Sequence, residues 1–217
     1  MKLTIFGASG RTGTHLAEQA IAAGHDVVAL MRNPAKLTLR HERLRVAQGD
    51  PTDEAAVADA VRGADAVLST LSAKIFGGPR GLPLASGTGD ILAAMRAHGV
   101  RRLVYSWGPS ILIPRNPLLR ALRSASFALF RLLPATRSFV NESAEVGEAI
   151  RGSDRGWTIV VVTAPNDKPG SGRVKVRTGT GSGDRVGSRI SRADLAEFML
   201  AQADDVRYAQ QELRISN

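Results

Sequence analysis

The stretch that decides the fold is "GASGRTG", residues 7–13, near the start of the chain. It follows the apolar run "LTIF", residues 3–6, and precedes "THLAEQAIAAG", residues 14–24, whose apolar positions recur with helical periodicity. Glycines at the first, fourth and seventh positions allow a tight turn between a strand and a helix. The sequence therefore predicts a strand, a glycine-rich loop and a helix as the first structural unit.

Beyond this unit, strand-like apolar runs alternate with helical patterns along most of the chain. We expect strands at residues 2–6, 26–31, 44–48, 66–70, 102–106, 158–163 and 212–215. We expect helices at residues 12–23, 53–61, 89–98, 141–151 and 189–203, and one short turn at 34–37. Two successive parallel strands of one sheet are joined by a right-handed crossover connection, here through a helix. The alternation thus predicts a Rossmann-like, doubly wound α/β fold, with a mainly parallel sheet flanked by helices on both faces.

The glycine loop has a chemical use in such a fold. Its backbone N–H groups can approach a pyrophosphate, which then rests on the positive end of the following helix. The spacing Gly-x-x-Gly-x-x-Gly differs from the Gly-x-Gly-x-x-Gly of the commonest dinucleotide fingerprint. Its place between a first strand and a helix nevertheless favours a dinucleotide site over a plain turn.

The end of the second expected strand indicates which dinucleotide binds. NAD-selective sites place an Asp or Glu there, on the ribose 2′-hydroxyl. The sequence is "ALMRNPAKL", residues 29–37, with Arg32 at the strand end, Lys36 one helical turn later and no acid. These cations, together with Arg11, can neutralise a 2′-phosphate. We therefore expect NADP(H) to be preferred over NAD(H); the alternative for Arg11 is an exposed loop arginine.

Length and composition narrow the class of protein. The 217 residues suit one domain, and 43% hydrophobic with 23% charged residues is typical of a soluble globular protein. No signal-peptide pattern and no membrane-spanning run is present, and the lack of cysteine fits a cytoplasmic protein. The formal charge of +9 comes largely from scattered arginines, so we expect no nucleic-acid partner. Without cysteine the chain can form no zinc–sulfur site, and we expect no metal. The oligomeric state is left as monomer or homodimer.

One segment, residues 109–137, breaks the alternation. It carries several arginines and no acid, with leucines and phenylalanines between prolines. We expect a single NAD(P)-binding domain over residues 1–217, in which 109–137 form a lid-like insertion and 164–217 a small C-terminal substrate-side region. A dimer surface, a membrane-surface helix or a solvated helix packed on the main domain are alternatives for 109–137.

Several stretches, taken in order, resemble the atypical short-chain dehydrogenase/reductase group of NAD(P)H-binding proteins, closest to its biliverdin reductase B (flavin reductase) and NmrA-like branch. The matching stretches are "GASGRTG", "MRNPAKL", "QGDPTDEAAVADAVRGADAVLSTL", "ILAAMRAHGVRRLVY", "GWTIVVVTAP" and "RISRADLAEFML". The resemblance covers most of the chain outside residues 73–85 and 109–137. It is specific for the fold and not for the substrate.

The resemblance implies a cofactor site along the carboxyl ends of the strands. The glycine loop would hold the pyrophosphate, Asp50 would approach the adenine, residues 70–72 would pass beside the ribose, and Pro165 with Asn166 would flank the nicotinamide. A turn carboxylate is the alternative interpretation of Asp50. The implied cofactor-binding residues are Gly7, Ala8, Ser9, Gly10, Arg11, Thr12, Gly13, Arg32, Asn33, Lys36, Asp50, Pro51, Thr70, Leu71, Ser72, Ser106, Trp107, Thr163, Ala164, Pro165 and Asn166.

The chain departs from the short-chain dehydrogenases that act on alcohols and ketones, which use a Tyr-x-x-x-Lys acid. Its only tyrosines, Tyr105 and Tyr208, are not followed by lysine at the fourth position. Flavins and quinones can take a hydride and then a proton from water, so we expect a small planar redox acceptor, with flavin possible as substrate.

The branch that the chain resembles has a serine after the fifth strand, near the nicotinamide. Ser106 and Ser110 are the catalytic candidates, although a gapless alignment places Gly108 there; a serine bonded to backbone is the alternative. Trp107 would stack on the substrate or fill the core. A non-catalytic NADP(H)-binding sensor is the second functional hypothesis. A sugar-nucleotide epimerase or dehydratase is less favoured, because it normally uses the missing tyrosine and lysine.

Overall fold

The computed structural model describes residues 1–72, 83–107, 134–162, 164–178, 187 and 189–217. Its strands are β1 (Lys2–Phe6), β2 (Asp26–Met31), β3 (Leu44–Gln48), β4 (Ala66–Ser69), β5 (Arg102–Trp107), β6 (Gly156–Val161), β7 (Ala164–Asn166), β8 (Lys175–Thr178), β9 (Arg189–Ser191) and β10 (Gln211–Ser216). Its helices are α1 (Arg11–Ala22), the 3-10 helix η1 (Pro34–Lys36), α2 (Glu54–Val61), α3 (Pro83–Ala97), α5 (Pro134–Arg151) and α6 (Arg192–Ala201).

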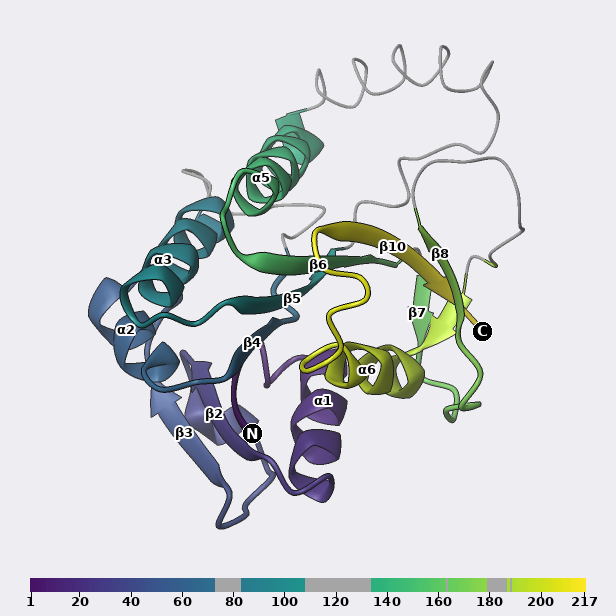
Figure 1. Cartoon of the computed structure of the whole chain (residues 1–217), viewed down its shortest axis with the longest axis horizontal. Helices are drawn as coiled ribbons and strands as arrows, with labels where there is room; N and C mark the ends of the chain where they lie inside the picture. The colour runs from purple at the N-terminus through teal and green to yellow at the C-terminus, as the bar shows by residue number, and fades with distance from the viewer. Residues whose placement is uncertain (73–82, 108–133, 163, 179–186, 188) are drawn as a thin grey trace.

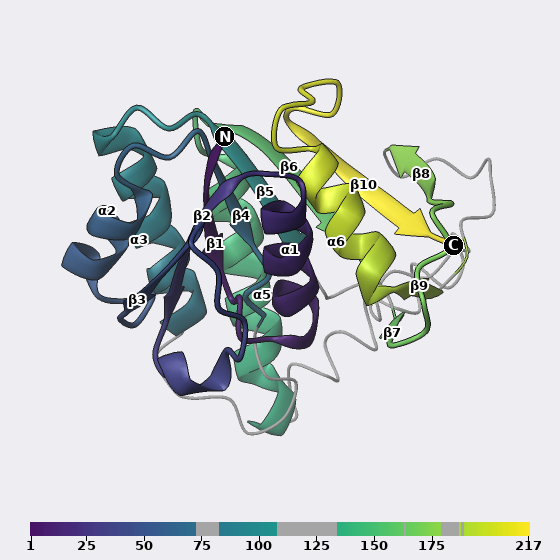
Figure 2. The same cartoon turned by 90° about the horizontal axis from the view of Figure 1, so that it is seen from below.

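The main sheet has the strand order β3-β2-β1-β4-β5-β6-β10-β8, in which β8 alone among these strands runs antiparallel to its neighbour. Helices α1 and α6 cover one face of the sheet, and α2, α3 and α5 cover the other (Figures 1 and 2). Strand β1 supplies both cores, since Leu3 and Ile5 pack in one apolar cluster and Phe6 in the other. The predicted doubly wound, mainly parallel α/β fold is confirmed.

Helix α3 begins six residues before the predicted start at Gly89, at Pro83. Proline suits the first position of a helix, and the next N–H, of Leu84, donates to the buried carboxylate of Glu142 on α5. A partner that lies on another helix leaves no local signal in the sequence. Gly87 is needed inside α3, because a Cβ there would lie 2.9 Å from the carbonyl oxygen of Pro51.

The expected C-terminal region, 164–217, is divided between two places. Strands β8 and β10 continue the main sheet beyond β6, and α6 packs on α1. Strands β7 and β9 form a separate two-stranded parallel sheet. The sequence predicted neither of them, nor β8, and the predicted helix at 189–203 was wrong for residues 189–191, which form β9 before α6 begins at Arg192. Residues 109–133 of the expected lid-like insertion lie outside the described residues, and 134–137 form the start of α5.

Asp194 joins α6 to the loop before β8. Its fully buried carboxylate accepts the N–H groups of Ser171 and Gly172 at 2.9 Å, the hydroxyl of Ser191 at 2.7 Å and the amide of Asn217. Burial acts to raise the pKa of Asp194, but these hydrogen bonds outweigh burial and lower the pKa to about 2. Asp194 is therefore an ionised structural carboxylate.

Arg102 holds the amino ends of the central strands together. Its buried guanidinium donates to the carbonyl oxygens of Gly156, Gln202 and Asp205, at 2.6, 2.7 and 3.2 Å, and to the hydroxyl of Thr158 at 2.8 Å. Burial lowers the pKa of Arg102. The side chain replaces water as the donor for four oxygens in two segments, β6 and the turn after α6.

Candidate cofactor site

The glycine loop brings β1, β4 and α1 into close contact. Gly7 has φ +85°, and a Cβ there would lie 2.7 Å from Thr70 Oγ1. A Cβ at Gly13 would lie 2.0 Å from the carbonyl oxygen of Gly7, which fixes glycine at this position. The N–H of Gly10 donates to that same oxygen at 2.9 Å and closes the turn.

The start of α1 is open to an anion. Gly10 is the N-cap, no side chain caps the helix, and its first turn carries no acid. The hydroxyl of Thr14, in the first turn of α1, donates to the carbonyl oxygens of Ala8 and Gly10 at 3.1 and 3.0 Å. These bonds fix the loop to the helix. Uncapped N–H groups and the helix dipole together favour a phosphate at this end.

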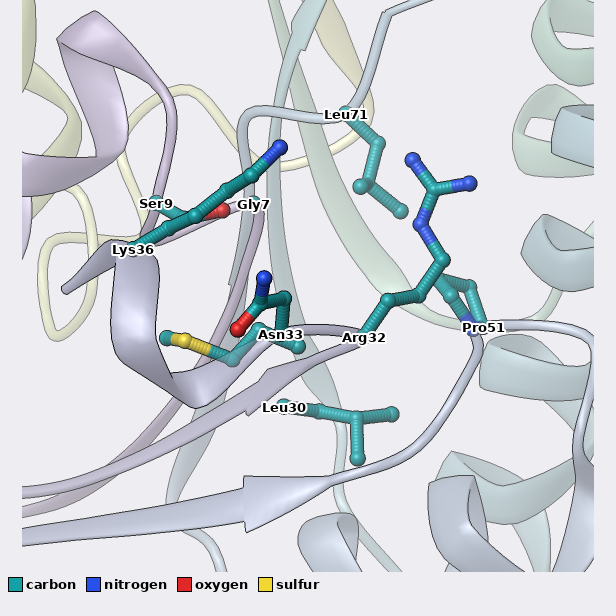
Figure 3. A pocket seen from close by; sticks show the side chains of 9 residues that line it. Gly7, Ser9, Leu30, Arg32, Asn33, Lys36, Pro51 and Leu71 are labelled. Carbon is teal, nitrogen blue, oxygen red and sulfur yellow. The ribbon is translucent and has the colours of Figure 1, made fainter.

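A cavity of about 430 Å³ lies beside the loop (Figure 3). It is lined by segments that follow β1, β2, β3 and β4, as ligand sites in open parallel sheets are. The lining residues are Gly7, Ser9, Leu30, Met31, Arg32, Asn33, Lys36, Pro51 and Leu71. All of them were predicted except Leu30 and Met31, whose apolar run indicated only a buried strand.

Two cations from the end of β2 face this cavity. Figure 3 shows Arg32 and Lys36 on opposite sides of Asn33. The Oδ1 of Asn33 accepts the N–H of Ala35 at 3.0 Å and caps η1, which carries Lys36. Within the described part of the chain Lys36 has no ion-pair partner, whereas Arg32 Nε lies 3.8 Å from Asp50 Oδ2.

Asp50 is a turn carboxylate in this structure. Its Oδ1 accepts the N–H and the hydroxyl of Thr52, at 3.0 and 2.8 Å. The backbone hydrogen bond from Thr52 is the main cause that lowers the pKa of Asp50, with Thr52 Oγ1 and Arg32 adding to it against partial burial. Asp50 does not line the cavity, and its contact with adenine stays a prediction.

Arg11 pairs with a carboxylate that does not line the cavity. Its Nη1 lies 3.3 Å from Oδ2 of Asp167, just after β7, and the other carboxylate oxygen of Asp167 is bound by Arg192 at the start of α6. Arg11 does not line the cavity. Its expected contact with the 2′-phosphate stays a prediction, and the structure gives it a protein partner that the sequence did not indicate.

The residues expected around the nicotinamide are placed in part. Thr70 Oγ1 donates to the carbonyl oxygens of Phe6 and Gly7 at 3.3 and 3.2 Å, Ser72 is exposed, and Ser106 is half-buried on β5. Ala164, Pro165 and Asn166 form β7, where Asn166 donates to the carbonyl of Ile190 at 3.1 Å. Ser110 and Thr163 lie outside the described residues.

The two aromatic side chains of β5 pack toward α3 and α5. Trp107 is half-buried against the core, and the Arg151 guanidinium lies 5.7 Å from its ring centroid. Tyr105 is fully buried, and burial raises the pKa of its hydroxyl to about 12. Tyr105 therefore keeps its proton at neutral pH. The stacking of Trp107 on a substrate stays a prediction.

The glycine turn, the open helix start and the cavity across the strand ends define a Rossmann-type nucleotide-binding domain. Residues 7–206 match the family described as NAD(P)H-binding, and the chain belongs to that family. The predicted NAD(P)H-binding family is thereby confirmed. Among the described residues, no helix has the length and apolar character needed to cross a bilayer.

Several characterised proteins are similar to the chain. A 2-alkyl-3-oxoalkanoate reductase of Stenotrophomonas maltophilia is 35% identical over 116 residues, which are 51% of this chain and 34% of that protein. The chain thus matches about a third of that relative's length. A short-chain dehydrogenase/reductase of Veillonella parvula, solved in complex with NADP, has TM-score 0.74 and 18% identity, covering 100% of this chain and 94% of the other. An anaerobilin reductase of Escherichia coli has TM-score 0.73 and 21% identity, covering 100% and 97%.

Proposed function

We propose that the protein is an NADPH-dependent reductase that transfers a hydride to a flavin, quinone or similar planar acceptor. The observation that carries the cofactor assignment is the pair of cations, Arg32 and Lys36, on the cavity at the end of β2. An acid at that place would bond the ribose 2′-hydroxyl and repel a 2′-phosphate. Arg32 and Lys36 instead supply positive charge where that phosphate would lie.

The residues present fit the rest of the dinucleotide. The uncapped start of α1 would hold the pyrophosphate, and the apolar side chains of Leu30, Pro51 and Leu71 would contact the adenosine. Residues 70–72, which follow β4, would pass beside the ribose, and the nicotinamide end would lie toward β5, the neighbour of β4 in the sheet. When bound, the nicotinamide supplies the hydride. The chain would align the two rings and exclude water between them.

The acceptor class follows from the missing acid. The sequence holds no Tyr-x-x-x-Lys, and Tyr105 is buried with a raised pKa. An acceptor whose reduced nitrogen or oxygen protonates from water needs no such group, and flavins and quinones meet this condition. The relatives named as reductases support reductase chemistry. The cytoplasmic location and the state of monomer or homodimer remain predictions.

An NADP(H)-binding sensor without turnover is the second candidate, favoured by the same missing acid. NADPH oxidation, followed at the nicotinamide absorbance with FMN, FAD, quinones and dyes, distinguishes the two. Steady turnover with a planar acceptor supports the reductase. Tight NADP⁺ binding without turnover supports the sensor, and turnover of a ketone alone contradicts the proposed acceptor class. For alanine variants of the two cavity cations, Arg32 and Lys36, the matched control is Arg45→Ala. Arg45 pairs with Asp59 at 3.0 Å and does not line the cavity.

A further inference from the structure

Arg11 and Arg192, the first residues of α1 and α6, share one carboxylate. Asp167 binds Arg11 through Oδ2 and Arg192 through Oδ1. Figure 2 shows α1 and α6 side by side, with β7 and β9 beyond the end where α6 begins. The three residues thus connect the glycine loop to the small second sheet.

The two arginines differ in how firmly they are held. The Arg192 side chain is 8% exposed, whereas those of Arg11 and Asp167 are 73% and 61% exposed. An exposed ion pair contributes little, because water and salt screen it. Arg192 is therefore the fixed partner that neutralises Asp167, and Arg11 is the partner that can leave.

Arg11 is also two residues from Ser9, which lines the cavity, and one residue from Gly10, the N-cap of the uncapped helix. A phosphate at the start of α1 would lie within reach of its guanidinium and would offer a stronger, charge-assisted contact than the exposed carboxylate. The carboxylate of Asp167, in turn, places a negative charge beside that phosphate.

We propose that Asp167 competes with the cofactor pyrophosphate for Arg11, so that the Arg11–Asp167 contact sets the affinity for both dinucleotides. The inference rests on the proposed nucleotide site. It concerns the pyrophosphate, which NAD⁺ and NADP⁺ share, and it is therefore independent of the selectivity assigned to Arg32 and Lys36.

Calorimetric titration of NAD⁺ and NADP⁺ into wild type, Asp167→Asn, Arg11→Gln and the double variant tests it. Asp167→Asn should tighten both dinucleotides by about two- to fivefold, the strength of an exposed ion pair. Arg11→Gln should weaken both by about tenfold. The loss caused by Arg11→Gln should be larger when Asp167 is already Asn, because the competitor is then gone. Asp59→Asn, which removes a carboxylate paired with Arg45, is the matched control and should change neither affinity.

Unchanged or weaker binding in a folded Asp167→Asn variant overturns the proposal, as does an equal cost of Arg11→Gln in both backgrounds. If Asp167→Asn does not fold because Arg192 loses its partner, Arg11→Gln alone decides, and unchanged affinity for both dinucleotides overturns it. If the wild type binds NAD⁺ and NADP⁺ equally, the proposed preference for NADP⁺ is wrong. The competition between Asp167 and the pyrophosphate for Arg11 is still tested, because it affects both dinucleotides alike.

Discussion

Replacing Gly13 with alanine should damage the cofactor site by moving the whole start of α1. The new Cβ would lie 2.0 Å from the carbonyl oxygen of Gly7, 2.7 Å from its carbonyl carbon and 2.8 Å from Ala8 Cα. All three are backbone atoms of the loop, so no side chain can turn away. Ordinary contact begins at 3.4 Å, so helix and loop must separate by about 1.4 Å.

Two quantities should change. Overpacking of this kind lowers the free energy of unfolding by about 1–3 kcal/mol, which in a domain of this size lowers the melting temperature by about 2–12 °C. The displaced N–H groups no longer reach a phosphate at hydrogen-bond distance. The loss of one such contact to a charged group, about 1.5–3 kcal/mol, weakens NADP⁺ binding by about ten- to hundredfold.

Thermal unfolding and calorimetric titration of NADP⁺ measure both effects. Gly10→Ala gives an intermediate case, since its Cβ would lie 3.2 Å from the same oxygen. Gly89→Ala, inside α3 with no atom of another segment within 4 Å of the new Cβ, is the matched control, and should raise stability by about 0.5–1 kcal/mol. A Gly13→Ala protein that melts and binds as wild type does would refute the close approach of α1 to the loop.

Three further variants test other parts of the structure. Lys36→Ala should weaken NADP⁺ binding by about ten- to hundredfold and leave NAD⁺ binding unchanged, because it removes from the 2′-phosphate end a cation that has no ion-pair partner among the described residues. An equal loss for both dinucleotides, measured by calorimetry, contradicts this role. Arg102→Met should lower the free energy of unfolding by about 3–5 kcal/mol, because several buried oxygens lose their donor. Denaturant unfolding compares this variant with Arg101→Met, which changes an exposed neighbour. A similar small effect in both variants would exclude the buried hydrogen-bond network. Asp194 has a folded pKa of about 2, below the unfolded value of about 3.9, so its contribution to stability is present above pH 4 and is lost as the pH falls toward 2. Asp194→Asn should therefore lower the stability at pH 7 and flatten the acid unfolding curve between pH 4 and pH 2. An unchanged curve argues against an ionised Asp194.

Local patterns were sufficient to predict the fold and most residues that line the cavity. Apolar runs indicated β1, β2, β4, β5 and β6, because in parallel strands covered on both faces almost every side chain is buried. Strand β3 lies at the edge of the sheet and was also predicted, although none of its residues is fully buried. Lining residues from four strand ends could be predicted because strand order alone brings these ends to one edge of the sheet. Arg32, Asn33 and Lys36 belong to this class, since their position depends on the end of β2 and the short turn after it.

Contacts between distant segments could not be predicted in this way. The start of α3 depends on Glu142 from α5, and the partner of Arg11 comes from the end of β7. Asp50 shows the opposite case: its sequence position fits adenine binding, but its nearest donors are two residues away in Thr52. Short, edge-placed strands such as β7 and β9 lack a run long enough to show a period.

Gly87 is the point at which α3 approaches the cavity wall most closely among the positions described above, because it lies against Pro51. The helix backbone lies so close to Pro51 that a methyl group at position 87 would meet its carbonyl oxygen at 2.9 Å and its Cβ at 3.0 Å. Any larger residue there pushes the turn after β3 outward, and Pro51 is part of the cavity wall. A substitution at position 87 should therefore change the fit of the adenosine end even though it alters no residue that lines the cavity.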